Sequence, residues 1–133
     1  MESQPRAVAV IEDDASMRKG VERLLNAHGF PTEGYASAET FLHRDPENAV
    51  ACIVLDIQLG GMSGLELGCR LQASDPGLPV IFITAVDDDV VELEATRLGC
   101  IAYLHKPFPA DLLIDAIHAA LAAPSKGADG KLG

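Results

Sequence analysis

Four short apolar segments in this chain each end in polar residues of the kind that phosphoryl chemistry uses. They are Val8–Ile11 before Glu12 and Asp13, Cys52–Leu55 before Asp56, Val80–Ile83 before Thr84, and Ile101–Leu104 before His105 and Lys106. In a parallel β-sheet, ligand-binding and catalytic groups gather at the carboxyl ends of the strands. The pattern therefore predicts a parallel sheet with one site assembled from several strand ends.

Helical patterns alternate with these strands along the chain. Apolar faces with helical spacing carry Met17, Val21, Leu24, Leu25 and His28 in the first helix and Leu113, Ile117 and Leu121 in the last. The other expected helices span 38–43, 65–74 and 87–98, and a weak strand covers Thr32–Tyr35. Five strands alternating with five helices predict an α/β fold, a doubly wound five-stranded parallel sheet with five helices.

Length and composition limit the number of domains and the kinds of partner. With 133 residues, 48% of them hydrophobic, the chain is expected to form one domain over residues 6–122, followed by a flexible tail or linker over 123–133. The net charge is −10 and no Lys/Arg cluster is present, which argues against nucleic-acid binding through this chain.

The cysteines and the apolar runs bear on the compartment. Cys52, Cys69 and Cys100 are odd in number and widely spaced, which favours free thiols in a reducing cytosol. The N-terminal residues lack an apolar signal segment, and no apolar run approaches the ~20 residues of a membrane span. We therefore expect a cytoplasmic protein without membrane contact.

Asp56 has two interpretations. An Asp that closes a buried strand either caps the following turn or acts as a nucleophile that forms an aspartyl phosphate. The second role needs a cation, and Mg²⁺ held by carboxylates is the usual one. Glu12 and Asp13 supply such carboxylates if the first and third strands are adjacent. The alternative is a solvated acidic turn, with Asp14 or Ser16 as the helix N-cap.

Thr84 and Lys106 are open to the same two kinds of interpretation. The Thr84 hydroxyl and the Lys106 ammonium suit phosphoryl oxygens, but a Thr after a strand is often structural and a Lys there is often a solvated surface residue. The occurrence of all these groups at strand ends, in one order, favours a common site.

The chain resembles the receiver domain of bacterial two-component response regulators over roughly residues 6–122. The stretches that carry the resemblance are Val10–Asp14, Val54–Ile57, Gly61–Leu67, Ile83–Ala85 and Lys106–Phe108. The resemblance implies a flavodoxin-like sheet with strand order 2-1-3-4-5. It also implies a cis peptide bond before Pro107, and X-Pro is the only common place for such a bond.

The resemblance also implies a metal site and a phosphoacceptor. Asp56 matches the phosphoacceptor, and Glu12 and Asp13 match the acidic pair that binds the Mg²⁺ cofactor. The backbone carbonyl of Gln58 matches the position that completes the metal site. Asp14 lies one position beyond the acidic pair, so we do not expect it to be a ligand.

Three further residues match family positions with a role in signalling. Lys106 matches the lysine that contacts the phosphoryl group, Thr84 the switch hydroxyl and Tyr103 the switch aromatic. In such a switch, phosphorylation draws Thr84 toward the phosphoryl group and Tyr103 moves inward. The surface of the fourth helix, fifth strand and fifth helix, about residues 88–121, then changes.

The implied function is that of a phosphoacceptor regulator and not of an enzyme with a substrate of its own. A sensor histidine kinase or phosphotransfer protein is the expected donor. A downstream protein or a second copy of the chain is the expected partner of the changed surface.

The loop after the phosphoacceptor departs from the family pattern, which usually has Leu-Pro-Gly or Met-Pro-Gly. Here the loop has Leu59-Gly60-Gly61. Because Gly has more backbone freedom than Pro, we expect a more mobile loop. Gln58 and Val86 stand at variable positions that tune dephosphorylation in the family. Val86 cannot hold an attacking water, so the phosphoryl lifetime should depend mainly on Gln58.

Three other functions fit the sequence less well. A phosphorylation-independent interaction module would keep the fold, but the full residue set argues against it. An aspartyl-phosphate phosphatase would want an acid two residues after the nucleophile, where Gln58 stands. A flavodoxin-like electron carrier would need a hydroxyl-rich phosphate loop after the first strand, where this chain has acids. The glycines at 60, 61 and 64 do not form a dinucleotide-binding motif.

Overall fold

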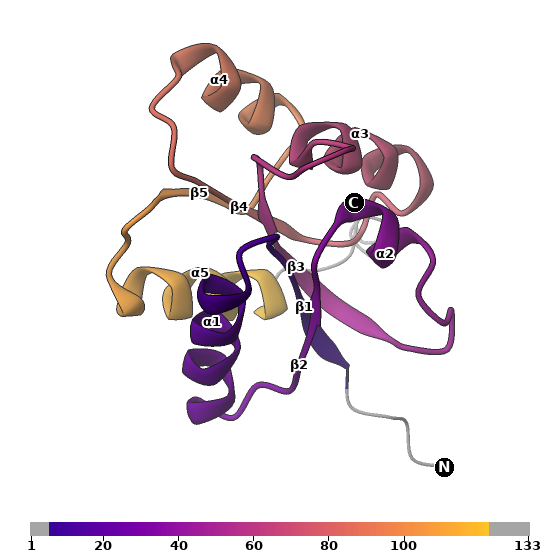
Figure 1. Ribbon diagram of the computed structural model, residues 1–133, viewed down its shortest axis with the longest axis vertical. Coiled ribbons are helices and arrows are strands. Elements are labelled where there is room, and N and C mark those ends of the chain that lie inside the picture. Colours follow the sequence, from indigo (N-terminus) through magenta and orange to yellow (C-terminus); the bar gives the residue numbers. More distant parts are fainter. Residues whose placement is uncertain (1–5, 123–133) are drawn as a thin grey trace.

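The computed structural model describes residues 6–122, which form a five-stranded sheet with helices on both faces (Figure 1). In chain order the elements are β1 Ala7–Ile11, α1 Ala15–Ala27, β2 Thr32–Tyr35, α2 Ala38–Leu42, β3 Val50–Asp56, α3 Gly64–Ser74, β4 Val80–Thr84, α4 Asp89–Arg97, β5 Ala102–His105 and α5 Ala110–Ala122. All strand pairs are parallel and the order is β2-β1-β3-β4-β5, which confirms the predicted fold. The expected tail over 123–133 lies outside the described residues.

Two apolar layers hold the sheet between its helices. On one face α1 and α5 pack against alternate strand residues that include Val10 and Val54. On the other face α2, α3 and α4 cover the residues in between, including Ile11 and Leu55. Because both faces are covered, the central strands are apolar without alternation, as is usual for parallel sheets. Among residues 6–122, no helix is long and apolar enough to cross a membrane.

The strand register brings the predicted site residues to one edge of the sheet. Ile11 pairs with Leu55, so the residues that follow them, Glu12 and Asp56, lie side by side. Asp56 pairs with Ile83, directly before Thr84. Thr84 pairs with the last residue of β5, directly before Lys106. The sequence pattern therefore becomes a spatial cluster through register alone.

Side-chain caps fix where the helices begin. The Asp14 carboxylate accepts hydrogen bonds from Ser16 N (2.9 Å) and Met17 N (3.2 Å), so Asp14 and not Ser16 caps α1. The Asp88 carboxylate likewise accepts from Val90 N (2.9 Å). For this reason α4 begins at Asp89, two residues later than the sequence pattern indicated.

The apolar faces of the first and last helices are shorter than predicted. His28 is exposed and forms the C-cap of α1, which ends where the chain turns at Gly29 with φ +88°. Leu121 is 43% exposed and follows Ala120, the last buried residue of α5. The helical spacing placed His28 and Leu121 on the apolar faces of these helices, and the structure shows that both side chains are exposed.

Candidate phosphoacceptor and metal site

Three carboxylates meet at the carboxyl ends of β1 and β3. Glu12, Asp13 and Asp56 each place one carboxylate oxygen within 4.8 Å of the others. Glu12 is 1% exposed and Asp56 2% exposed, whereas Asp13 is exposed. A set of hard oxygen donors with one open side suits Mg²⁺, which prefers a few carboxylates and keeps several waters.

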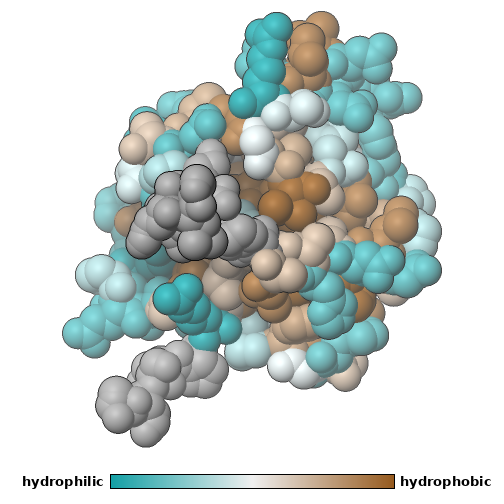
Figure 2. Space-filling view, turned by 180° about the vertical axis from the view of Figure 1, so that it is seen from behind, coloured by the Kyte–Doolittle hydropathy of each residue, from teal (hydrophilic) through white to brown (hydrophobic). Residues whose placement is uncertain are grey.

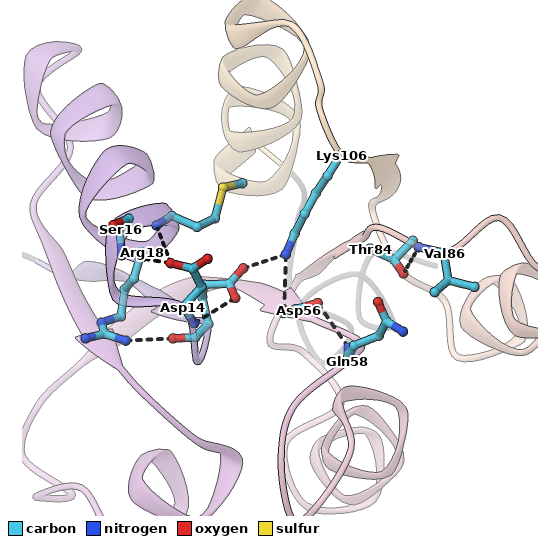
Figure 3. Close-up of polar contacts among 10 residues, drawn as sticks. Asp14, Ser16, Arg18, Asp56, Gln58, Thr84, Val86 and Lys106 are labelled. Atoms are coloured by element: carbon cyan, nitrogen blue, oxygen red, sulfur yellow. Dashed lines mark hydrogen bonds and ion pairs between the residues drawn. The ribbon is translucent and has the colours of Figure 1, made fainter.

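Lys106 reaches into this cluster from the end of β5 (Figure 3). Its Nζ donates to Glu12 Oε1 at 2.8 Å and to Asp56 Oδ2 at 3.3 Å. Burial lowers the pKa of the Lys106 ammonium, but the hydrogen bond to Glu12 and the charge of Asp56 outweigh this effect, so the pKa is raised. The ammonium is therefore a fixed positive charge beside Asp56. The Lys106–Pro107 peptide bond is cis, as the resemblance implied.

Glu12 is the most constrained acid of the cluster. Its Oε2 accepts a hydrogen bond from Asp14 N at 3.1 Å, and its backbone carbonyl accepts one from Arg18 Nη1 at 2.8 Å. Burial raises the pKa of the Glu12 carboxyl, and the hydrogen bond to Lys106 acts in the opposite direction. Asp14 itself is not part of the three-carboxylate group. Arg18 was not singled out from the sequence, because an Arg on an amphipathic helix gives no sign of such a contact.

The backbone after β3 lies close against Asp56. Gln58 N donates to Asp56 Oδ1 at 3.0 Å, and Gly64 N donates to the Ile57 carbonyl at 2.9 Å. A Cβ at Gly64 would overlap the Asp56 carbonyl oxygen and the Ile57 α-carbon. Gly64 is thus required for the close approach of α3 to the end of β3. Figure 3 shows Gln58 directly beside Asp56.

Thr84 and Tyr103 lie on the β4–β5 side of Asp56. Thr84 is fully buried, and its hydroxyl accepts a hydrogen bond from Val86 N at 3.1 Å (Figure 3). The Tyr103 ring is half-buried and packs edge-to-face on His105 with ring centroids 5.4 Å apart. Within the described part of the chain, the buried Tyr103 hydroxyl has no hydrogen-bond partner. Thr84 and Tyr103 are therefore near the site but outside its ion-paired cluster.

A family model and curated relatives match most of the chain. The model of the response regulator receiver domain matches residues 8–118. The transcriptional regulatory protein FixJ of Bradyrhizobium diazoefficiens is 34% identical over 114 residues, which is 86% of this chain and 56% of FixJ. The transcriptional regulatory protein TdiR of Thauera aromatica is 35% identical over 122 residues, covering 92% of this chain and 54% of TdiR. The chain spans about half the length of the curated relatives it matches.

Solved structures agree in fold. The response regulator StyR superposes with a TM-score of 0.79 at 43% identity, covering 89% of this chain and 60% of StyR. The crystal structure of FixJ-N gives a TM-score of 0.80 at 31% identity, covering 91% of this chain and 97% of that one. A BeF3-activated receiver domain of DrrB gives 0.80 at 28% identity, covering 90% of this chain and all of that domain, 100%.

Proposed function

Because the chain belongs to the response regulator receiver domain family, in which phosphorylation and Mg²⁺ binding are typical, we propose that it is a phosphoacceptor switch phosphorylated on Asp56. The observation that carries the proposal is the position of Asp56 Oδ2, 3.3 Å from Lys106 Nζ and within a group of three carboxylates. In this proposal the switch domain comprises residues 6–122.

The proposed reaction is transfer of a phosphoryl group from the phosphohistidine of a kinase or phosphotransfer protein. A carboxylate oxygen of Asp56 attacks phosphorus in line, and the P–N bond breaks. The imidazole nitrogen keeps the electron pair of that bond, and a mixed anhydride forms on Asp56. Lys106 stabilises negative charge on the phosphoryl oxygens from a position that it already holds.

The metal ligands in this proposal are Glu12, Asp13, Asp56 and the backbone carbonyl of Gln58. The residue types fit because all donors are oxygens and two of the carboxylates are buried. Bound Mg²⁺ supplies positive charge that offsets the charge of the phosphoryl oxygens. Before binding, Lys106 is the cation that keeps Glu12 and Asp56 together.

The proposed output is a change in the surface formed by α4, β5 and α5, residues 88–121, triggered through Thr84 and Tyr103. This surface carries exposed apolar side chains, with Val90 68% and Leu93 52% exposed. In Figure 2, hydrophobic and hydrophilic surface adjoin at the top of the molecule, where α4 projects. Exposed apolar residues rimmed by polar ones are typical of interaction surfaces. A cytoplasmic location follows from this proposal.

Charge favours a basic partner over a second copy at this surface. The stretch 88–121 contains acids at six positions, all exposed: Asp88, Asp89, Glu92, Glu94, Asp111 and Asp115. Its Lys and Arg residues are Arg97 and Lys106, and Lys106 is bound to Glu12 and Asp56. A two-fold symmetric contact would place this acidic surface against itself, which is unfavourable.

Intact mass after incubation with Mg²⁺ and acetyl phosphate tests the proposal. We expect one added phosphoryl group, absent in Asp56→Asn and in a sample with metal chelated. Hydrogen exchange of the same samples should change over residues 88–121 only where the adduct forms. An adduct that persists in Asp56→Asn, or no adduct at early time points in the wild-type protein, would refute the assignment.

A further inference from the structure

The loop that follows the phosphoacceptor is tied to a helix distant in sequence. The β3–α3 loop, residues 57–63, runs from Asp56 to the start of α3. Met62 N in this loop donates a hydrogen bond to Glu39 Oε2 at 2.9 Å, across 23 positions of the chain. Glu39 stands in the first turn of α2. A carboxylate of α2 therefore holds the loop from outside.

One glycine of the loop, Gly61, lies against this carboxylate. Gly61 has φ +75°, which favours glycine, and a Cβ there would lie 2.9 Å from Glu39 Oε2. The Met62 N–H is the main reason why the pKa of Glu39 is lowered, so the carboxylate is ionised at neutral pH. At Gly60, by contrast, a Cβ would have nothing within 4 Å, and its φ is not positive. Only Gly61 is thus demanded by the contact.

The two ends of the loop have different anchors. At the β3 end, Gln58 N is bonded to Asp56 Oδ1 at 3.0 Å. At the α3 end, Met62 N is bonded to Glu39. Among the described residues, the N–H groups of 59, 60 and 61 between these anchors have no acceptor. The bond from Gly64 N to the Ile57 carbonyl closes the base of the loop. The bond from Met62 N to Glu39 is the hydrogen bond that holds the glycine-rich span between these points from outside the loop.

We propose that Glu39 is a positioning residue that holds the β3–α3 loop so that the Gln58 carbonyl and Asp56 stay arranged for Mg²⁺. It does for this loop what a proline at position 60 would do by stiffening the backbone. The inference rests on the proposed function for its metal readout, but the contact with Met62 can be measured without metal. Glu39 does not touch the metal or the phosphoryl group and acts only through the loop.

A double-mutant cycle tests this role. The variants are Glu39→Gln, Gly60→Pro and the two combined, with Glu47→Gln as a control for loss of one exposed acid. Gly60→Ala serves in place of the proline variant if that variant does not fold. Hydrogen exchange of the Met62 amide is measured without metal. The apparent Mg²⁺ dissociation constant is then measured from the metal-dependent shift in melting temperature.

We expect Glu39→Gln, which leaves a neutral and weaker acceptor, to speed Met62 exchange and to weaken apparent Mg²⁺ affinity by about threefold to tenfold, the scale of the difference between a charged and a neutral hydrogen bond. The same change in the Gly60→Pro background should alter affinity by less than about twofold. Glu47→Gln should leave both readouts unchanged. An equal loss of affinity in both backgrounds would show a plain charge effect and overturn the proposal. So would unchanged affinity despite faster Met62 exchange.

Failure of the proposed function would look different. In that case the wild-type protein itself would show no Mg²⁺-dependent shift and no phosphoryl adduct. Met62 exchange would still report whether Glu39 holds the loop. Slow exchange of Met62 that is also insensitive to Glu39→Ala, which removes the acceptor altogether, would show that Glu39 does not hold the loop.

Discussion

The two sides of the sheet differ in how firmly they hold their side chains. All five residues of β1 are buried, as are the last five of β3, which end at Asp56. Lys106 bonds to Glu12 and Asp56, and Glu12 is also held by Arg18 and the Asp14 backbone. No residue of β5 is fully buried, and α4 buries only Ala95. The Tyr103 hydroxyl has no partner among the described residues.

The difference suggests that the β1–β3 side serves the phosphoryl chemistry and the α4–β5 side serves signalling. A phosphoacceptor site needs its charges in place before reaction, because preorganised groups cost no rearrangement. A signalling surface needs alternative arrangements of similar free energy, and regions with little buried apolar area have low local stability. The β1–β3 side fits the first need and the α4–β5 side the second.

Among the substitutions considered, loss of the Lys106 ammonium should destabilise the β1–β3 side of the sheet most. Lys106→Met keeps the aliphatic stem but leaves Glu12 and Asp56 as buried carboxylates without a cation. We expect a loss of roughly 2–3 kcal/mol in unfolding free energy. This is less than the cost of breaking a fully buried pair, because the Lys106 side chain is 20% exposed. Phosphorylation by acetyl phosphate should slow by about 100-fold or more.

The matched control is Lys19→Met, the same chemical change at an exposed position of α1. Urea unfolding of both variants gives the comparison. Equal stability of the two variants would mean that Lys106 does not hold the acids together.

The rates at which thiol reagents modify the three cysteines should compare the β1–β3 side with the α4–β5 side directly. Cys52 in β3 is fully buried, and burial raises its pKa to about 12. At pH 8 its thiolate fraction is therefore roughly a thousandfold below that of a free cysteine. Cys100, just before β5, is half-buried, and Cys69 on α3 is exposed. We expect thiol reagents to modify Cys69 first, then Cys100 through local opening, and Cys52 only with global unfolding.

Time-resolved peptide mapping of the labelled wild-type protein measures all three rates at once. Modification of Cys52 as fast as Cys100 would contradict the contrast between the two sides of the sheet.

Much of the fold and of the site residues could be predicted from the sequence, but not all of them. Residues at strand ends could be identified because parallel register carries them to one edge whatever the details of packing, as with Glu12, Asp56 and Thr84. The N-cap of α1 was open between Asp14 and Ser16, since either side chain can accept from the first turn.

Contacts that join distant segments through single side chains gave no sequence signal. Arg18 and Glu39 both look like ordinary helix-surface charges, and only the folded geometry brings one to the Glu12 carbonyl and the other to Met62 N. The exposure of His28 and Leu121 was missed for a related reason. Periodicity shows which residues share a helix face but not where the covering sheet ends.

Replacing each of the two tyrosines by Phe compares the loss of a hydrogen-bonded hydroxyl with the loss of an unbonded one. The Tyr35 hydroxyl donates to Glu33 Oε1 at 2.7 Å, whereas the buried Tyr103 hydroxyl lacks a partner among residues 6–122. Tyr35→Phe should therefore lower the unfolding free energy by about 1 kcal/mol. Tyr103→Phe should raise it by up to about 1 kcal/mol, because a buried unpaired group is removed. Urea unfolding decides the sign, and destabilisation by both changes would show that the Tyr103 hydroxyl has a partner in solution.

The smallest expected effect is a pH dependence of the stability that Tyr35 adds, and alkaline titration measures the pKa behind it for one tyrosine at a time. The chain has two tyrosines and no tryptophan, so tyrosinate absorbance in each single Tyr→Phe variant reports the other tyrosine alone. Burial, and then the bond to Glu33, raises the pKa of Tyr35 from 10.0 to about 12. Since the folded pKa is the higher one, the stability that Tyr35 adds is complete below pH about 10 and is lost as the pH rises toward 12. The stability difference between wild type and Tyr35→Phe should shrink over that range.

Added salt should act differently on the pKa values of the two tyrosines. The pKa of Tyr103 is raised by burial and by the charges of Glu92, Asp88 and Asp87, which are exposed acids at α4 and just before it. At 1 M salt the screening length is about 3 Å, so these charges act much less, while the direct bond from Tyr35 to Glu33 persists. Added salt should therefore lower the pKa of Tyr103 more than that of Tyr35. An equal shift for both would mean that the acids of α4 do not act on Tyr103, and the electrostatic link between that helix and β5 would be lost.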